Sequence, residues 1–295
     1  MLSERMAVAG VKMRTAVGTS TDNHSSDQRI STLSPFRYPG GKSWLRHIIV
    51  DWLNEIDFKP TLFLEAFGGG ASVSLAVAEV VAARRVLIVE RDPQVAAVWR
   101  TILGNDWKRL TRLIRRFRVS RRSVRKVLDA EPTDDLHIAF RCLVRNRMSR
   151  GGILAQRAGI LNHGENGQGL RSRWYPETLS KRIRAIHQLA SRLEFKEGDG
   201  LQEIRRQCNS ERLVVFADPP YSARPSHPGQ RLYDFNEFDH IKLFEILAGC
   251  KGRCVITYKE SSPVRRLAEE FGFEIRRIPM RTAHHRKRYE LFISN

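Results

Sequence analysis

Residues 61–70 read Thr61-Leu62-Phe63-Leu64-Glu65-Ala66-Phe67-Gly68-Gly69-Gly70, and an apolar stretch from Ala71 to about Ala83 follows. The apolar run predicts a buried strand, the three glycines predict a tight turn, and the following stretch has the period of a helix. A strand, a glycine turn and a helix N-terminus in this order are typical of a nucleotide-binding cradle. The sequence therefore predicts an α/β fold with a ligand site at the end of this first strand.

A second predicted strand, residues 85–89, ends at Glu90, twenty residues beyond Gly70. An acidic side chain in this place commonly accepts hydrogen bonds from the hydroxyls of a ribose, so Glu90 is a candidate ribose-binding residue. A phosphate-loop interpretation of Gly40-Gly41-Lys42-Ser43 is disfavoured, because Phe36 stands where that loop needs its first glycine.

The rest of the chain predicts an α/β core that is split by a basic helical insert. Further strands are expected at residues 194–196, 213–217, 253–257, 273–279 and 288–293, and helices at 44–52, 94–144, 176–193, 238–248 and 263–271. The Ser-, Thr- and Gly-rich start has no apolar period and is expected to be disordered. The resulting division is a tail at 1–32, a first core part at 33–105, the insert at 106–194 and a second core part at 195–295.

The motif Asp218-Pro219-Pro220-Tyr221 directly follows the buried-strand pattern of residues 213–217. The ends of such strands are where open α/β sheets bind ligands, and the prolines stiffen the turn while their carbonyls stay available as acceptors. Asp218 and the carbonyl of Pro219 are placed to accept both hydrogens of an exocyclic amine, while Tyr221 stacks on the ring that bears it. The motif predicts attack by an amino nitrogen, although a tight loop before a helix would also explain the four residues alone.

The charge of the chain indicates a polyanionic partner. It has 51 Lys and Arg against 32 Asp and Glu, a net charge of +19, and residues 106–194 hold 21 basic against 8 acidic residues. Arginine, which predominates here, suits bidentate contacts to phosphate and to guanine edges. A solvated helix face explains a single basic run, but an excess concentrated in one segment indicates a nucleic-acid-binding surface.

The remaining composition is typical of a globular cytoplasmic protein. Of 295 residues 41% are hydrophobic, which supports a core, and no stretch approaches 18 uncharged apolar residues, so we expect no membrane span. Cys142, Cys208, Cys250 and Cys254 lack the pairing pattern of a secreted scaffold and the spacing of a zinc site. This predicts buried thiols and no metal. We expect a monomer.

Four elements, at residues 37–42, 63–73, 217–221 and 289–295, occur in one order along the chain. They resemble, in turn, the Lys-Trp-Ala-Gly-Gly-Lys element, the glycine-rich S-adenosylmethionine (AdoMet) loop, the catalytic motif and the last strand of the Dam-type, D12-class DNA adenine N6-methyltransferases. The resemblance covers residues 34–295. It implies a Rossmann-like AdoMet-dependent methyltransferase core with an inserted α-helical DNA-recognition subdomain, acting on double-stranded DNA.

The resemblance also implies which residues bind the methionine part of AdoMet. Tyr38 and Lys42 should contact the cofactor, with Lys42 near its methionine carboxylate. The backbone of Phe67, Gly68 and Gly70 should approach the methionine moiety closely.

Two further acidic residues are implied to bind the nucleoside part of AdoMet. Glu90 should bind the ribose hydroxyls, although the family usually has Asp in this place, as it has Trp where this chain has Tyr38. Asp199 either accepts a hydrogen bond from the adenine amino group of the cofactor or is a turn aspartate, and the sequence does not distinguish the two.

The catalytic motif of the resemblance is Asp218, Pro219, Pro220 and Tyr221, which implies direct methylation of adenine N6, with cytosine N4 less favoured. Asp218, near the transferring methyl group, also provides favourable electrostatics for the sulfonium of the cofactor. A cytosine C5-methyltransferase would need a nucleophilic Cys, normally after Pro, and none of the four cysteines follows a proline. The target adenine must be flipped out of the duplex, where Tyr221 and Tyr38 can stack on it.

The insert is the predicted target-recognition region. Asn146-Arg147-Met148-Ser149-Arg150-Gly151-Gly152 resembles an Arg-and-Gly turn found there in some D12 members. Arg145, Arg147 and Arg150 are candidates for base or phosphate contacts, with phosphate positioning favoured for most arginines. The alternatives that remain are methylation of adenine in RNA or of a glutamine amide in a protein, and a catalytically silent DNA-binding relative.

Overall fold

The computed structural model describes residues 31–37, 41–152, 154, 159–161, 164, 169–220, 238–281 and 287–295. Two residues of the predicted site, Tyr38 and Tyr221, lie outside the described residues, as does nearly all of the predicted tail. All other residues of the predicted site lie within the described part of the chain.

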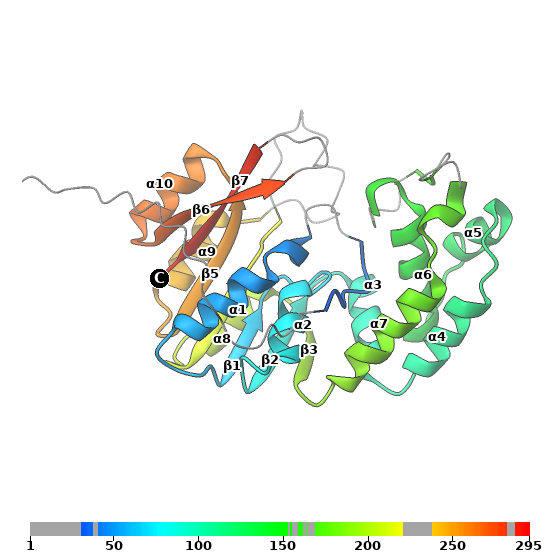
Figure 1. Ribbon diagram of the computed structural model, residues 1–295, viewed down its shortest axis with the longest axis horizontal. Coiled ribbons are helices and arrows are strands. Elements are labelled where there is room, and N and C mark those ends of the chain that lie inside the picture. Colours follow the sequence, from blue (N-terminus) through cyan, green and yellow to red (C-terminus); the bar gives the residue numbers. More distant parts are fainter. Residues whose placement is uncertain are drawn as a thin grey trace, which may run out of the picture.

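A seven-stranded mixed sheet forms the centre of the fold (Figure 1). Its order is β3-β2-β1-β4-β5-β7-β6, and β7 runs antiparallel to both of its neighbours while the other pairs are parallel. The strands are β1 Leu62–Glu65, β2 Arg85–Glu90, β3 Leu193–Glu197, β4 Leu213–Ala217, β5 Arg253–Lys259, β6 Glu274–Arg281 and β7 Lys287–Ser294. This is a Rossmann-like α/β sheet.

The strand order reverses direction between β1 and β4, and this fixes where a ligand can bind. These two strands pair in parallel with Glu65 opposite Phe216, so the loops that follow them leave the sheet side by side. The crevice beyond the carboxyl ends of strands at such a reversal is the usual ligand site of open α/β sheets.

Helices cover both faces of the sheet because each strand buries side chains on two sides. On one face lie α1 Arg46–Glu55, α2 Ser72–Glu79 and α3 Pro93–Leu103, which pack with Phe63 and Ile88. On the other lie α8 Gly200–Gln207, α9 His240–Ala248 and α10 Ser262–Glu270, which pack with Leu64 and Val215. The alternation of Phe63 and Leu64 between the two cores follows from the two-residue period of a strand.

Four helices lie between α3 and β3, at one end of the molecule (Figure 1), within the segment predicted as the insert. They are α4 Trp107–Arg116, α5 Arg121–Leu128, α6 Asp135–Met148 and α7 Pro176–Gln188. Their apolar side chains belong to the same buried cluster as α1 to α3. Arg100 of α3 bonds Asp135 of α6 at 2.7 Å and also pairs with Glu197 of β3, so the insert is fastened to the sheet.

The structure differs from the sequence prediction in three elements. The helical stretch 94–144 is divided among four helices, and the predicted helix 176–193 ends at Gln188 because the chain enters β3 at Leu193. The predicted end of the insert at residue 194 therefore falls inside a strand. Helix α8 was not predicted, since only Leu201 and Ile204 give its eight residues an apolar side.

The prediction of four buried thiols is wrong for two cysteines. Cys208 and Cys250 form a disulfide across 42 residues, whereas Cys142 and Cys254 are free and buried. Sequence spacing did not reveal the pair. The two cysteines lie at the C-terminal ends of α8 and α9, which meet only because both helices pack on the same face of the sheet. Among the described helices, none has the length and apolar character that crossing a membrane requires.

Candidate active site

The glycine turn after β1 packs directly onto β2. The amide of Gly68 donates to the carbonyl of Val89 at 2.7 Å, and a Cβ added to Gly68 would lie 2.4 Å from Cγ2 of Ile88. The next residue, Gly69, has φ +45°, and its carbonyl accepts from the indole of Trp99 at 2.9 Å. Glycine is therefore needed at Gly68 for the close approach, and the turn has a fixed position relative to the end of β2.

Glu90, at the end of β2, is tied to this turn. One oxygen accepts from the amide of Gly69 at 2.7 Å, and the other accepts from the amides of Arg91 and Asp92 at 2.7 and 2.8 Å. Burial raises the pKa of Glu90, although the amides of Asp92, Gly69 and Arg91 act in the opposite direction. A carboxylate offers about four lone-pair sites, so one remains on the oxygen that faces Gly69, which suits a ribose hydroxyl.

Asp218 leaves the end of β4 next to the glycine turn and is held from two sides. Its Oδ1 accepts from the hydroxyl of Thr257 on β5 at 3.0 Å and pairs with Nζ of Lys42 at 2.8 Å. The side chain keeps 24% of its surface exposed, whereas the following Pro219 is buried. The carboxylate therefore has a fixed orientation at a solvent-accessible strand end.

Lys42 lies between two carboxylates. It is the first residue of the 3-10 helix Lys42–Trp44, and its ammonium contacts Asp218 and Glu290 of β7, both at 2.8 Å. Burial alone would lower the pKa of Lys42, but the charges and hydrogen bonds of Asp218 and Glu290 raise it overall. Lys42 thus forms an ion pair with Asp218, the predicted catalytic residue. Its contact with the methionine carboxylate of the cofactor stays a prediction.

Three residues near Asp218 and the glycine turn were not identified from the sequence as site residues: Thr257, Glu290 and Glu65. Glu290 is buried directly before the apolar run Leu291-Phe292-Ile293 of β7, and a charged residue beside such a run is a signal that the sequence did offer. Glu65 ends β1, is 4% exposed and accepts from the amide of Ser74 at 2.8 Å. Burial raises the pKa of Glu65 to about 8, opposed by Ser74 and reinforced by Asp218 and Glu90.

Asp199 follows β3 and caps α8. Its Oδ1 accepts from the amide of Gln202 at 3.0 Å, which fits the interpretation as a turn aspartate. The preceding Gly198 donates to the carbonyl of Glu90 at 2.9 Å, so Asp199 lies beside the proposed ribose-binding residue. A contact to the adenine of the cofactor stays a prediction.

The three arginines predicted to contact DNA have different environments. Arg145 and Arg147, in the last turn of α6, are buried, while Arg150 is exposed. Arg147 donates to the carbonyl of Pro35 at 2.8 Å, and burial, together with Arg182 and Arg37, lowers its pKa to about 10. Arg145 donates to Gln94 at 3.5 Å.

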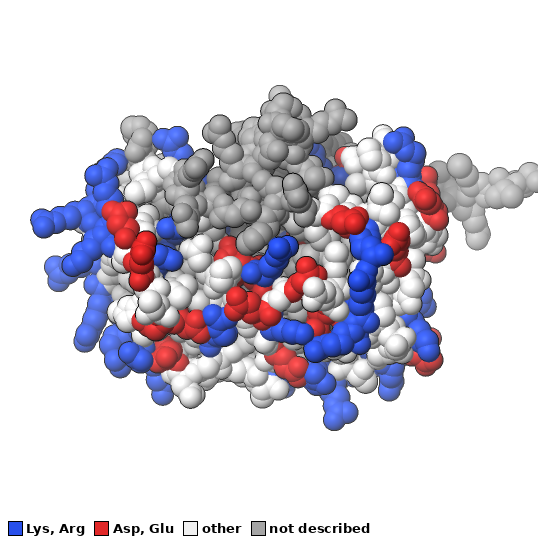
Figure 2. Space-filling model, turned by 180° about the vertical axis from the view of Figure 1, so that it is seen from behind, with Lys and Arg blue, Asp and Glu red and all other residues white. Residues whose placement is uncertain are grey.

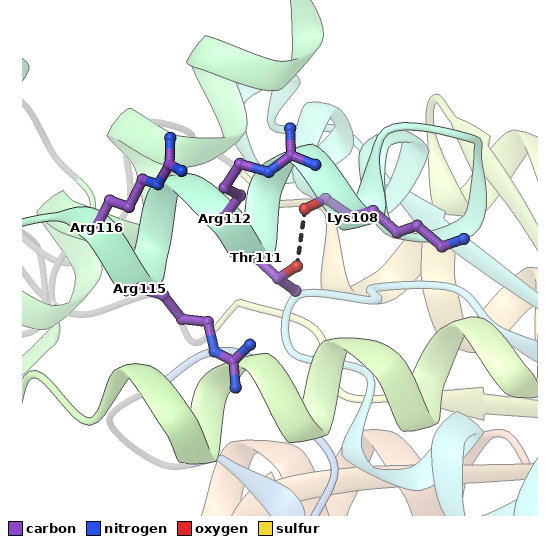
Figure 3. A pocket seen from close by; sticks show the side chains of 5 residues that line it. All are labelled: Lys108, Thr111, Arg112, Arg115 and Arg116. Atoms are coloured by element: carbon purple, nitrogen blue, oxygen red, sulfur yellow. Dashed lines mark hydrogen bonds between the residues drawn. The ribbon is translucent and has the colours of Figure 1, made fainter.

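The exposed basic residues of the insert gather on α4 and α5. Figure 2 shows Lys and Arg crowded at the end of the molecule that these helices form. A hollow of about 310 Å³ on α4 has four cationic residues and Thr111 in its wall (Figure 3). Arg115 turns toward α7, where it pairs with Glu177 at 2.6 Å. On these two helices and the loop between them, the exposed basic residues are Lys108, Arg109, Arg112, Arg115, Arg116, Arg118, Arg121, Arg122, Arg125 and Lys126.

In the described part of the chain, no group of three or more His, Cys, Asp or Glu residues is arranged to hold a metal ion. The Rossmann-like sheet, with a glycine turn, the carboxylate of Glu90 and Asp-Pro-Pro at three neighbouring strand ends, has the fold of the AdoMet-dependent methyltransferases. The model of the D12 class N6 adenine-specific DNA methyltransferase family matches residues 38–278, and the chain belongs to this family. It is therefore an AdoMet-dependent DNA adenine methyltransferase, as the resemblance of its motifs predicts.

Solved structures with similar folds include other methyltransferases. The rRNA methyltransferase AviRa from Streptomyces viridochromogenes is 15% identical, with 88% of this chain and 86% of that chain covered and a TM-score of 0.39. Precorrin-6y C5,15-methyltransferase from Geobacter metallireducens is 10% identical, with coverage of 92% and 91% and a TM-score of 0.36. No curated protein matches the chain significantly.

Proposed function

We propose that the end of β4 performs the methyl transfer in this enzyme. Asp218 and the carbonyl of Pro219 accept the two N6 hydrogens of an adenine and orient its nitrogen lone pair. When bound, AdoMet supplies an electrophilic methyl group on a sulfonium. The N6 nitrogen would gain a bond to the methyl carbon while the bond between that carbon and the sulfonium sulfur breaks, so that the sulfur leaves as a neutral thioether. The nitrogen would also lose one proton, which Asp218 would accept. No covalent bond to the protein is formed.

The observation that supports this proposal most is the fixed carboxylate at the reversal point of the sheet. Thr257 and Lys42 hold Asp218 at 3.0 and 2.8 Å, so the side chain is oriented before a substrate arrives. Such preorganisation lowers the reorganisation needed during the reaction. Tyr221 and Tyr38, whose rings we expect to stack on the flipped adenine, are assigned from the sequence alone.

The cofactor would bind across the ends of β1, β2 and β3. The turn of Phe67, Gly68 and Gly70 would face the methionine part, and Glu90 would accept from a ribose hydroxyl. The remaining lone-pair site on Glu90 and its position beside the turn fit this group. Asp199 is the proposed neighbour of the cofactor adenine.

The insert, residues 106–194, is the proposed contact surface for double-stranded DNA, to which the enzyme would bind as a monomer in the cytoplasm. The exposed arginines of α4 and α5 suit phosphates, and Arg150 is the exposed member of the three arginines predicted at the end of α6. Arg145 and Arg147 are buried, so we assign them to contacts within the protein.

The direct test is product identification. The purified protein is incubated with labelled AdoMet and unmethylated DNA, the DNA is digested to nucleosides, and N6-methyl-2′-deoxyadenosine is expected as the labelled product. Asp218→Ala should retain AdoMet binding and lose transfer, with Asp239→Ala, a helix cap on α9, as the control. Label in RNA or in a protein glutamine, but not in DNA, would contradict the proposal. AdoMet binding without any transfer would indicate a silent relative.

A further inference from the structure

A short segment before Lys42 joins the insert to the core. Residues 31–37, which we call the strap, are held through their backbone carbonyls by side chains of three helices. The contacts are Arg46 of α1 to Ser31, Arg182 of α7 to Ser34 at 3.1 Å, and Arg147 of α6 to Pro35 at 2.8 Å. Donors from both parts of the molecule therefore fix the path of the strap.

The side chain of Asn146 on α6 forms hydrogen bonds with both backbone groups of Arg37, the last residue of the strap. The amide of Arg37 donates to Oδ1 of Asn146 at 2.8 Å, and Nδ2 donates to the carbonyls of Arg37 at 3.0 Å and Gly152 at 2.9 Å. Asn146 has no exposed surface, and both hydrogens of its amide are in use. One buried side chain thus fixes both polar backbone groups of Arg37.

Gly152 closes the other side of this clamp. It has φ +78°, and a Cβ added there would lie 2.2 Å from the carbonyl oxygen of Arg37. Any larger residue would push Arg37 away from Asn146. The turn that follows α6 is therefore built against the strap and not only against its own helix.

Arg37, which the clamp holds, lies close to Lys42 along the chain. Lys42 follows Arg37 by five residues, a length of chain that spans about 18 Å at most even when fully extended. Lys42 in turn contacts Asp218 at 2.8 Å. Because only a short stretch of chain separates Arg37 from Lys42, a change in the position of Arg37 should also affect the ion pair that orients Asp218.

We propose that Asn146 is a positioning residue for methyl transfer. It couples the insert to Asp218 through the backbone of Arg37 and the ammonium of Lys42, so that the insert sets the geometry of catalysis as well as binding DNA. This inference rests on the proposed catalytic role of Asp218. It assigns Asn146 no contact with DNA or cofactor.

The test measures the rate of a single turnover at saturating DNA and AdoMet. Asn146→Ala should lower this rate on the order of tenfold to a hundredfold, because small misplacements of reacting groups have effects of this size. DNA affinity, measured separately, should change less than threefold. Gly152→Ala, which displaces the same carbonyl from the opposite side, should act in the same direction. Val144→Ala, a buried change on the same helix, is the control for lost packing.

A double-mutant cycle separates positioning from a general structural effect. If Asn146 acts through Lys42, then Asn146→Ala in a Lys42→Met background should lower the rate little further. Full additivity, or a rate no lower than that of Val144→Ala, would show that the inference is wrong. If Asn146→Ala does not fold, the same cycle with Gly152→Ala decides the question.

The outcomes also separate this inference from the proposed function. A wild-type protein that forms no N6-methyladenine would overturn the function itself. An active wild type, combined with additive variants, would overturn only the coupling.

Discussion

At the residue scale, the site depends on one ammonium shared by two carboxylates. Lys42 and Glu290 are both about 5% exposed, and Asp218 is the more accessible partner. Removing one partner from a buried charge cluster is usually destabilising, because the remaining charges lose their compensation. Since the pKa of Lys42 is raised, its contribution to stability is complete below the ordinary lysine pKa and is lost only at higher, alkaline pH.

Glu290→Gln should lower the turnover rate about tenfold by loosening the ammonium that orients Asp218. The affinity for AdoMet should change little, since Glu290 contacts Lys42 and not the glycine turn. Steady-state kinetics and calorimetric titration with AdoMet measure the two effects. Glu274→Gln, an exposed change on β6, is the matched control. An unchanged turnover rate would separate Glu290 from catalysis.

Glu65 should make the stability of the protein depend on pH. Its pKa is raised from 4.5 to about 8, so between these values the folded state binds more protons than the unfolded state. The free energy of unfolding should therefore fall by a few kcal/mol as the pH rises through this window.

Glu65→Gln imitates the protonated side chain and should remove much of this pH dependence. Urea unfolding at pH 5.5 and pH 8 should show a smaller difference for the variant than for the wild type. Equal pH dependence of the two proteins would mean that Glu65 does not titrate in this range.

At the element scale, the glycine turn links β1 and β2 into one binding edge. Its position comes from the bond between Gly68 and Val89 and from the Glu90 carboxylate that accepts from Gly69. The strands themselves are buried and rigid, so a change in the turn alone should affect ligand binding before it affects the fold.

Gly68→Ala should weaken AdoMet binding about tenfold and destabilise the protein by about 1–3 kcal/mol, because the new methyl group overlaps Ile88. Equilibrium titration and thermal unfolding measure these effects. Gly249→Ala, whose Cβ would meet atoms no closer than 3.6 Å, is the control. An AdoMet affinity like that of the control would place the cofactor away from this turn.

The sequence predicted secondary-structure elements most accurately where a short local pattern marks their ends. Strand β4 was predicted at its observed residues, and β1 and β2 within one residue, because buried apolar runs end in turn signals. Glu90 and Asp218 lie at the strand ends where the sequence predicted them, and their proposed roles stay predictions. The ion pair of Lys42 with Asp218 and Glu290 joins residues more than 70 positions apart in the chain, and such contacts depend on sheet order, which no local pattern contains.

At the scale of the whole molecule, the main feature is the uneven distribution of basic and acidic residues. Residues 106–194 hold 21 basic and 8 acidic residues, and the basic ones crowd one end of the molecule (Figure 2). A field of this kind favours association with DNA without selecting its sequence, since phosphates are everywhere along the duplex. If the insert binds DNA as proposed, the choice of target sequence has to come from contacts other than these phosphate contacts.

Replacing Arg112 and Arg116 by Gln should weaken DNA binding and reduce the slope of log K against log salt by about one to two. Both residues line the hollow on α4 (Figure 3), away from the strand ends, so the turnover rate at saturating DNA should stay the same. Arg205→Gln with Arg266→Gln removes the same charge from exposed positions on α8 and α10. Equal salt slopes for the two double variants would remove α4 from the interface.

The place of β7 in the sheet has a consequence for how the enzyme is made. β7 follows β6 in the chain but lies between β5 and β6, so the described edge of β5 stays open until residues 287–294 have left the ribosome. An open strand edge can pair with other chains, which makes this interval of synthesis the one most exposed to aggregation. Glu290 belongs to the same strand, so the nascent protein completes the ion pairs of Lys42 only when this edge of the sheet is covered.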